Sequence, residues 1–433
     1  MFPGSAGSAA RAILECGFVV LATPVLMFPL VYPWVTVGVS LLVGIWVVGV
    51  TVFDWQGSRF GKLAGPLGLP WGILAVWTMI GAFVSTSPDL TLPKFTGVVL
   101  GMLALRAVLL TGTTSPRVWW LATAYLLAAA AMVVGGLLAG PRWLRKVEIL
   151  YYLNSQIPRV VLGLPGAPGG VNSTALGGAT LWLLPVAAIL AVHGWRMTRQ
   201  AFRAGAGRGL AILETVGCGI AALVSLFVLA LSQARGAWLA VPLVGVLALA
   251  FRFRLVTLPR AIGTAAGLAA FLWLGPWSLS TILGPERPYI WSLATAAIRA
   301  HPIAGVGLGA FRIAEAGPAP EFGVDQVFFA AHAHNIFLQV ALDVGLPGLL
   351  AYVALLGLAT RMMYQVLCRD SDGHQKALCL GLWANLAAVH IFGLADALAL
   401  GTKVGIFFWW NLGLIAALHH VVQRRWAAER MGS

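Results

Sequence analysis

One histidine stands where a polar segment of the sequence meets a long apolar run. His334 is followed by Asn335 and by the apolar stretch that begins at Ile336. An imidazole at such a boundary can reach a substrate in water while its helix is held in lipid. Its ordinary pKa of about 6.5 suits a general base or a hydrogen-bond partner. Boundary histidines also serve structural roles, so this residue alone leaves both interpretations open.

Two arginines are placed where they can complement an anionic substrate. Arg235 begins an apolar run after Ser232-Gln233-Ala234, and Arg287 lies in a polar stretch before Trp291. Guanidinium groups donate paired hydrogen bonds to phosphate oxygens. An arginine at an apolar boundary usually has a partner or a task, because burying it in lipid is costly. The alternatives are snorkelling to headgroups for Arg235 and a solvated loop charge for Arg287.

No zinc motif accompanies these residues. His332 and His334 are two positions apart, but the sequence lacks the carboxylate and histidine spacing that zinc sites use. We therefore expect neither a metal ion nor another cofactor.

The composition places most of the chain in a membrane. Of its 433 residues, 60% are hydrophobic and 10% are charged, whereas about a quarter of the residues in a soluble domain are charged. About twelve apolar runs are long enough to cross a hydrocarbon core of about 30 Å as helices. The sequence therefore predicts an all-α membrane protein, a single polytopic domain over residues 1–433. We draw the spans at 13–30, 35–53, 67–84, 97–111, 118–138, 175–194, 210–231, 236–251, 261–279, 335–360, 377–400 and 404–421.

Basic residues predict the orientation, because Lys and Arg in short loops resist transfer across a membrane. Their clusters at 59–62, 196–208, 252–260, 361–376 and 424–430 fall on one side of the predicted spans. We assign that side to the cytoplasm, which places both termini there in a multi-pass protein of the inner membrane. Since the net charge of +14 is spread over many short loops, we expect contacts with membrane lipids and no nucleic acid.

Two connections are long enough to hold structure of their own, and both fall on the outer side. The loop at 140–174, between the fifth and sixth spans, carries Arg142 and Arg145, and positive charge outside favours an anionic ligand. The larger loop at 280–334 has an apolar stripe of helical spacing between Ile290 and Ile298. This stripe predicts an amphipathic helix at the membrane surface. We place the functional site in these loops.

A glycine-rich segment follows that amphipathic stripe. His301-Pro302 ends the helical pattern, and Gly305, Gly307 and Gly309 allow a tight, closely packed turn. The spacing does not indicate a dinucleotide site, because no strand precedes it and no βαβ unit follows.

Four stretches resemble, in the same order, the motifs of the O-antigen ligase/polymerase superfamily. The last is the most informative, because His334-Asn335 is followed by Asp343-Val344-Gly345-Leu346-Pro347-Gly348. Asp396 resembles a late acidic residue of the family. The first half of the chain resembles the family in hydropathy alone. The other three stretches are Gly170 to Ala175, Ser232 to Trp238, and Arg287 with Trp291 followed by His301 to Phe311.

The resemblance implies a membrane glycosyltransferase of the C type (GT-C-like), metal-independent and inverting. Its donor is a glycan linked to undecaprenyl diphosphate. Its acceptor is a hydroxyl of lipid A-core oligosaccharide or a similar molecule on the periplasmic face. On this basis we assign the diphosphate to two arginines and the acceptor hydroxyl to a histidine. The catalytic residues are Arg235, Arg287 and His334, and the substrate-binding residues are Asn172, Arg142, Arg145 and Asp396.

We expect different roles for the acidic residues Asp343 and Asp396. Asp343 lies nine residues after His334, about 13 Å along an ideal helix, so we expect it to pair inside the bundle without touching the histidine. For Asp396, polarising a catalytic group and pairing with Lys403 both stay open.

Other activities also fit the sequence. Within the family, a polymerase that extends lipid-linked glycans and a protein O-oligosaccharyltransferase share these motifs. Outside it, many spans with intramembrane charges suit a transporter or flippase of polysaccharides or lipid-linked glycans. The polar motifs gather in the second half of the chain and in the outer loops, which favours the transferase. We expect a monomer.

Overall fold

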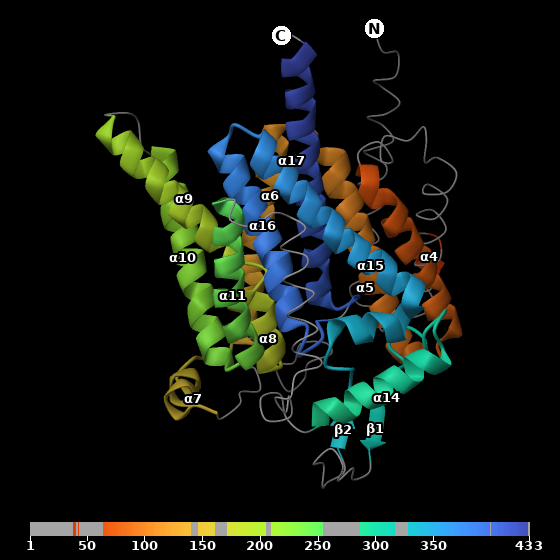
Figure 1. Cartoon of the computed structure of the whole chain (residues 1–433). Helices are drawn as coiled ribbons and strands as arrows, with labels where there is room; N and C mark the ends of the chain where they lie inside the picture. Colours follow the sequence, from red (N-terminus) through yellow and green to blue (C-terminus); the bar gives the residue numbers. More distant parts are fainter. Residues whose placement is uncertain are drawn as a thin grey trace. The chain divides into compact units, whose positions relative to one another are not determined.

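Helices make up nearly all of the described chain (Figure 1). The structure is a computed structural model that describes residues 38–39, 42, 64–139, 146–160, 171–204, 209–253, 286–316, 328–398 and 400–431. Within these ranges, eight helical stretches are long and apolar enough to cross a membrane. They are Gly65–Val84, Pro88–Thr111, Ser115–Leu138, Ser173–Arg203, Ala211–Ser232, Arg235–Arg252, Ile336–Arg369 and Ile406–Met431. The prediction of an all-α membrane protein is confirmed.

The span count of about twelve stays a prediction. The spans predicted at 13–30, 35–53 and 261–279 lie wholly or largely outside the described residues.

The chain divides into two compact units, which are described separately. Unit 1 comprises Met1–Thr113, Ser280–Leu358 and Ala399–Ala417, and unit 2 comprises Thr114–Leu279, Ala359–Leu398 and Leu418–Ser433. Two helices contribute residues to both units, namely α15 (Ile336–Arg369) and α17 (Ile406–Met431). The other elements of unit 1 are η1 (Gly65–Leu67), α4 (Gly68–Val84), α5 (Pro88–Thr111), α14 (Glu286–Ala300), β1 (Ile313–Ala316), β2 (Phe328–Ala330) and η3 (Lys403–Gly405). Those of unit 2 are α6 (Ser115–Leu138), α7 (Glu148–Ser155), α8 (Ser173–Thr180), α9 (Leu184–Arg203), α10 (Gly209–Ser232), α11 (Arg235–Arg252) and α16 (Gly373–Phe392).

Small residues let the helices of unit 1 approach closely. A Cβ atom at Gly101 of α5 would clash with the indole of Trp409 in α17, and one at Gly97 would clash with the carbonyl group of Gly401. Trp409 is fully buried. Small residues at helix interfaces are typical of membrane proteins, where packing and not hydrophobic exclusion brings helices together.

The first long helix after the outer loop, α15, is broken at Gly345. This residue has φ 69° and ψ 178°, a conformation that glycine adopts without steric cost. The backbone N–H of Leu346 donates to the oxygen of Pro302 at 2.8 Å, and the N–H of Val306 donates to the oxygen of Leu342 at 2.8 Å. The loop after α14 therefore satisfies backbone groups that the interrupted helix leaves free.

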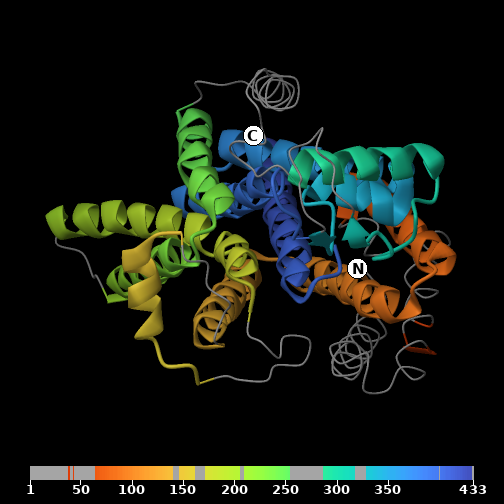
Figure 2. The same cartoon turned by 90° about the horizontal axis from the view of Figure 1, so that it is seen from below.

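The amphipathic helix predicted in the outer loop is α14. Its residues Ile290 and Ala294 are buried, and Ala294 packs in one cluster with Ala333 and Leu342. Both views show α14 beside the first part of α15 (Figure 1, Figure 2). The apolar face of α14 is thus covered by protein within unit 1.

A small sheet in the outer loop was not predicted. Strands β1 and β2 pair antiparallel, with Ile313 opposite Ala330 and Ala316 opposite Phe328. This pair is the two-stranded sheet of the described residues. Strand β2 ends directly before the segment that carries His334.

In unit 2, the span predicted at 175–194 is interrupted between α8 and α9. Pro185 cannot donate a backbone hydrogen bond and is accommodated at the first turn of α9. The carbonyl oxygen of Trp182 accepts from Tyr125 Oη and from Asn385 Nδ2, both at 2.7 Å, and Asn385 Oδ1 accepts from the N–H of Val186 at 3.0 Å. These buried side chains complete the hydrogen bonds that the interruption exposes.

The span predicted at 377–400 differs from the structure. Helix α16 begins earlier, at Gly373, where Asp372 caps it by accepting from the N–H groups of His374 and Gln375. It ends at Phe392, and it is not among the eight apolar stretches of the described chain. The apolar residues after Phe392 belong to a turn and not to the same helix.

Candidate active site

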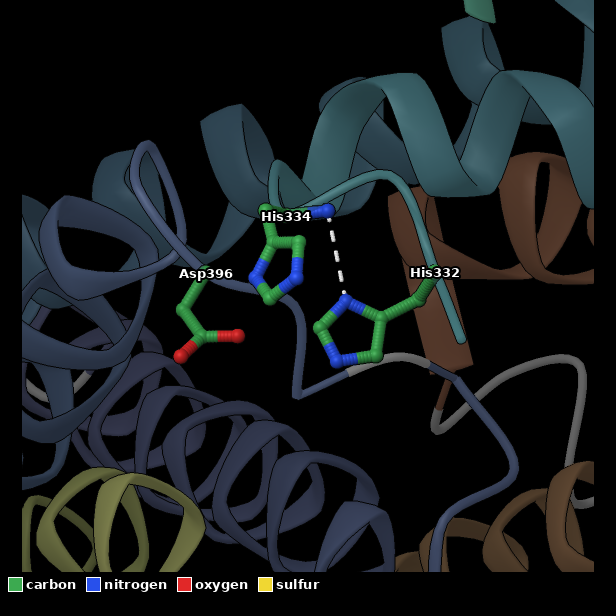
Figure 3. A group of neighbouring side chains, drawn as sticks. All are labelled: His332, His334 and Asp396. Atoms are coloured by element: carbon green, nitrogen blue, oxygen red, sulfur yellow. Dashed lines mark hydrogen bonds between the residues drawn. The ribbon is translucent and has the colours of Figure 1, made fainter. Parts of the chain in front are cut away.

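His334 lies in a tight turn between β2 and α15. Its φ of 47° is left-handed, which is unusual for a residue with a side chain. The N–H of His334 donates to Nδ1 of His332 at 3.2 Å, and the two imidazole rings lie 4.2 Å apart (Figure 3). Asn335 then caps α15, because its Oδ1 accepts from the N–H groups of Phe337 at 3.0 Å and Leu338 at 3.1 Å. The half-buried imidazole is therefore presented at the N-terminus of a capped helix.

Two side chains hold the peptide groups of the preceding residue, Ala333. Its N–H donates to Oε1 of Gln339 at 2.9 Å, and its carbonyl oxygen accepts from Nε1 of Trp291 at 3.0 Å. Trp291 lies on α14, one turn after the half-buried Arg287. Residues four apart share one face of a helix. The helix that carries Arg287 is thus hydrogen-bonded to the turn that carries His334.

A buried ion pair lies behind this turn. Asp343 is fully buried, and its Oδ2 pairs with Nζ of Lys94 at 2.5 Å. Its Oδ1 accepts from the N–H of Gly309 at 2.9 Å and from Nε2 of Gln339 at 3.0 Å. A buried carboxylate is tolerated when it is paired and hydrogen-bonded in this way. The pairing predicted for Asp343 is confirmed, with Lys94 of α5 as the partner.

The glycine-rich segment packs as the sequence predicts. Gly305, Gly307 and Gly309 all have positive φ, at 72°, 107° and 76°. A Cβ at Gly305 would clash with the carbonyl oxygen of Leu342, and one at Gly307 would approach the Cα of Ser85 to 2.6 Å. Only glycine fits these approaches, and the segment places the N–H of Gly309 on Asp343.

Arg235 in unit 2 lies at the first position of α11 and is exposed. The turn before it contains Gln233, which is fully buried and has φ 52°. The Oε1 atom of Gln233 accepts from the N–H groups of Lys146 and Val147, both at 2.8 Å. Nζ of Lys146 also donates to the carbonyl oxygen of Gln233 at 3.4 Å. A second cationic residue is therefore fixed to the turn that presents Arg235.

Asn172 caps α8, a role that does not need a substrate. Its Oδ1 accepts from the N–H groups of Thr174 at 2.8 Å and Ala175 at 3.3 Å. Helix α8 packs on the Arg235 turn, because a Cβ at Gly177 would lie 2.5 Å from the Cβ of Ala234. Asn172 is exposed, and a contact with substrate stays a prediction.

The other three residues assigned to substrate binding are Arg142, Arg145 and Asp396. Arg142 and Arg145 lie outside the described residues. Asp396 lies in unit 2, where its Oδ1 accepts from the N–H of Ala397 at 2.8 Å. The side chain of Lys403, its other proposed partner, is outside the described side chains. Both interpretations of Asp396 stay open.

The structure joins Arg287 to the His334 turn within unit 1, and it joins Lys146 to the Arg235 turn within unit 2. Trp291 makes the first connection and Gln233 makes the second. Sequence reasoning missed Gln233, and it also missed Gln339, which holds Ala333 from the other side. Glutamine neither titrates nor acts as a nucleophile, so a search for chemically active residues passes over it. The available signal was position, because both glutamines stand in apolar surroundings beside a candidate residue.

Comparison with protein families identifies one match. Residues 220–353 match the family described as O-Antigen ligase. The matched range contains Arg235, Arg287 and His334, while Asn172 and Asp396 lie outside it. No match is found among curated proteins.

Proposed function

We propose that the chain is a member of the O-antigen ligase/polymerase superfamily and that it transfers a glycan from undecaprenyl diphosphate to an acceptor hydroxyl. The match over residues 220–353 and the membrane-spanning helices support this proposal. We further propose that the reaction takes place on the periplasmic face of the inner membrane, with lipid A-core oligosaccharide or a similar molecule as acceptor. The proposed orientation places both termini in the cytoplasm.

In the proposed reaction, the acceptor oxygen attacks the anomeric carbon of the donor sugar. A new carbon–oxygen bond forms while the bond from the anomeric carbon to the diphosphate breaks, and the diphosphate leaves with the electron pair. Attack opposite the leaving group inverts the anomeric configuration. Arg235 and Arg287 stabilise the negative charge that develops on the diphosphate, since guanidinium groups bind phosphate oxygens strongly. His334 orients the acceptor hydroxyl and takes its proton.

One observation carries this assignment, namely the fixed left-handed conformation of His334. A side chain in this region costs about 1 to 2 kcal/mol relative to ordinary helical backbone. A strained backbone conformation persists where surrounding contacts hold it in place, and such conformations are concentrated at functional sites. Here Trp291 and Gln339 hold the adjacent Ala333 on both sides. The turn therefore presents its imidazole in a defined direction, as acceptor alignment requires.

The test is a reconstituted transfer reaction. Purified protein is incubated with a defined undecaprenyl-diphosphate glycan and with lipid A-core, a second lipid-linked repeat unit, or a peptide as acceptor, in the presence of EDTA. We expect a lipid A-core product by mass spectrometry. A product on the second repeat unit would assign the chain as a polymerase, and a product on the peptide would assign it as a protein transferase. Transport of the intact donor in vesicles, without transfer, would contradict the proposal.

Variants identify the residues. Arg235→Ala, Arg287→Ala and His334→Ala should each abolish transfer at unchanged protein abundance. Arg299→Ala is the matched control for Arg287, because Arg299 is an exposed arginine of the same helix α14. Full activity in all three site variants would show that the assignment is wrong.

A further inference from the structure

Gln339 uses both ends of its side chain inside unit 1. It is 1% exposed, its Oε1 accepts from the N–H of Ala333 at 2.9 Å, and its Nε2 donates to Oδ1 of Asp343 at 3.0 Å. An amide is needed for this bridge, because one end must accept a hydrogen bond and the other must donate one. The side chain therefore connects the residue before His334 with the buried carboxylate one helical turn further along α15.

Asp343, at the far end of this bridge, has three partners among the described residues of unit 1. Asp343 is anchored by Lys94 of α5 and by the backbone of Gly309, as well as by Gln339 itself. Lys94 is 15% exposed and Asp343 is 0% exposed. An ion pair in such surroundings is screened little by solvent, so it fixes the position of the carboxylate.

The near end of the bridge is the strained turn. Ala333 is fully buried and His334 is left-handed. Releasing the N–H of Ala333 would leave a buried donor without its acceptor, which is unfavourable. Of the two side chains that hold the peptide groups of Ala333, Trp291 would then remain. The hydrogen bond from Ala333 thus opposes relaxation of the His334 backbone.

We propose that Gln339 is a positioning residue for His334. Its side chain connects the Lys94–Asp343 ion pair to the turn that presents the imidazole. The proposal rests on the proposed function for its kinetic consequences. It assigns to the acidic residue of the Asp343-Val344-Gly345 segment an indirect part in acceptor alignment. Asp343 acts on the histidine through the amide of Gln339.

The first test separates positioning from substrate binding. Gln339→Leu removes both hydrogen bonds at similar volume, so we expect kcat for glycan transfer to fall by about 10- to 100-fold. The KM for the lipid-linked donor should change little. Gln365→Leu is the matched control, because Gln365 is another glutamine of α15 and its Oε1 contacts His419. The control should leave kcat unchanged, and equal kcat values for wild type and Gln339→Leu would overturn the proposal.

The second test measures the pH dependence of a different variant, so it does not depend on correct folding of Gln339→Leu. In Gln339→Glu, an ionised carboxylate would accept from Ala333 but would repel Asp343, while a protonated one would accept from Ala333 and donate to Asp343 as the amide does. Lys94 and Asp343 are the charged groups at the far end of the bridge, and the imidazoles of His332 and His334 lie at its near end. We expect the activity of Gln339→Glu relative to wild type to rise as the pH falls from about 8 to about 6. A ratio that stays constant with pH would contradict the bridge.

A third measurement does not need transferase activity. Diethyl pyrocarbonate modifies accessible imidazoles, and mass spectrometry follows the rate at His334. This rate should increase in Gln339→Leu and stay at the wild-type value in Gln365→Leu. An unchanged rate would overturn the positioning role. Absence of transfer by the wild type would count against the proposed function, while the rate at His334 would still decide the role of Gln339.

Discussion

The turns that present His334 and Arg235 each contain a strained residue, but this residue has a different role in each turn. His334 and Gln233 are the two residues other than glycine with positive φ in the described chain. In unit 1 the strained residue is itself the candidate catalytic group, and side chains from elsewhere hold its neighbour. In unit 2 the strained residue is a buried glutamine, and Arg235 follows it two positions later at an exposed helix start.

The difference indicates how much freedom each side chain needs. A group that aligns a hydroxyl and takes its proton has to point in one direction, whereas a cation that neutralises a diphosphate works over a range of positions. Hydrogen bonds on both sides hold the peptide groups of Ala333, directly before the half-buried imidazole. The guanidinium of Arg235 is exposed, and Gln233 holds the turn before it. We therefore expect disruption of the first turn to lower kcat and disruption of the second to raise KM for the donor.

The largest expected effect separates strain from chemistry at His334. Glycine adopts the left-handed conformation without steric cost, so His334→Gly should fold at least as well as the wild type. It should nevertheless lose about 100- to 10,000-fold in kcat, the usual contribution of a general base. Thermal unfolding in detergent and initial rates of transfer measure the two effects. Retention of more than a tenth of the wild-type kcat would place the chemistry elsewhere.

The next largest effect is expected at the Lys94–Asp343 ion pair, which lies behind the His334 turn. Asp343→Ala leaves Lys94 without its partner and should lower the free energy of unfolding by about 3 to 5 kcal/mol, as for other broken buried pairs. Replacing both residues should cost less than the sum of the single changes. Chemical denaturation of the three variants gives the coupling, and strict additivity would show that the pair does not act as a unit.

Gln233 offers the corresponding test in unit 2. Gln233→Ala leaves the N–H groups of Lys146 and Val147 without their acceptor and should destabilise the protein by about 1 to 3 kcal/mol. Gln233→Gly loses the same hydrogen bonds but relieves the left-handed strain, so it should be the more stable of the two. Both variants should raise the KM for the donor more than they lower kcat. A pure kcat effect would remove the distinction between the two turns.

The smallest effect tests whether Asn172 does more than cap a helix. Asn172→Ala removes the cap of α8 and should lower stability by about 1 kcal/mol. Asn172→Ser retains a capping oxygen and should restore most of that loss. If the serine variant is stable yet shows a raised KM for the donor, the asparagine also contacts substrate. If stability and KM both return to the wild-type values, the cap accounts for the residue.

Local patterns in the sequence predicted local structure well. The apolar stripe between Ile290 and Ile298 predicted α14, and the spacing of Gly305, Gly307 and Gly309 predicted a closely packed turn. Both depend on residues that are near one another along the chain. That Asp343 pairs was also predictable, because a carboxylate within an apolar run needs a partner.

Contacts between distant segments were not predictable from these patterns. Lys94 and Asp343 are separated by most of the chain, and hydropathy does not indicate which basic residue meets which acid. The interruption before Pro185 depends on Asn385 and Tyr125, which supply hydrogen bonds from other helices. The β1–β2 pair was missed because its strands are short and lie within a loop.

The pairing of Lys94 with Asp343 has a consequence for a protein in an energised membrane. Two opposite charges 2.5 Å apart carry no net charge, so a transmembrane voltage exerts no net force on them. A lone charge that moved through the full field would gain or lose about 2.3 kcal/mol per 100 mV. We therefore expect the support of the His334 turn to respond little to the membrane voltage, and loss of either partner should increase that response.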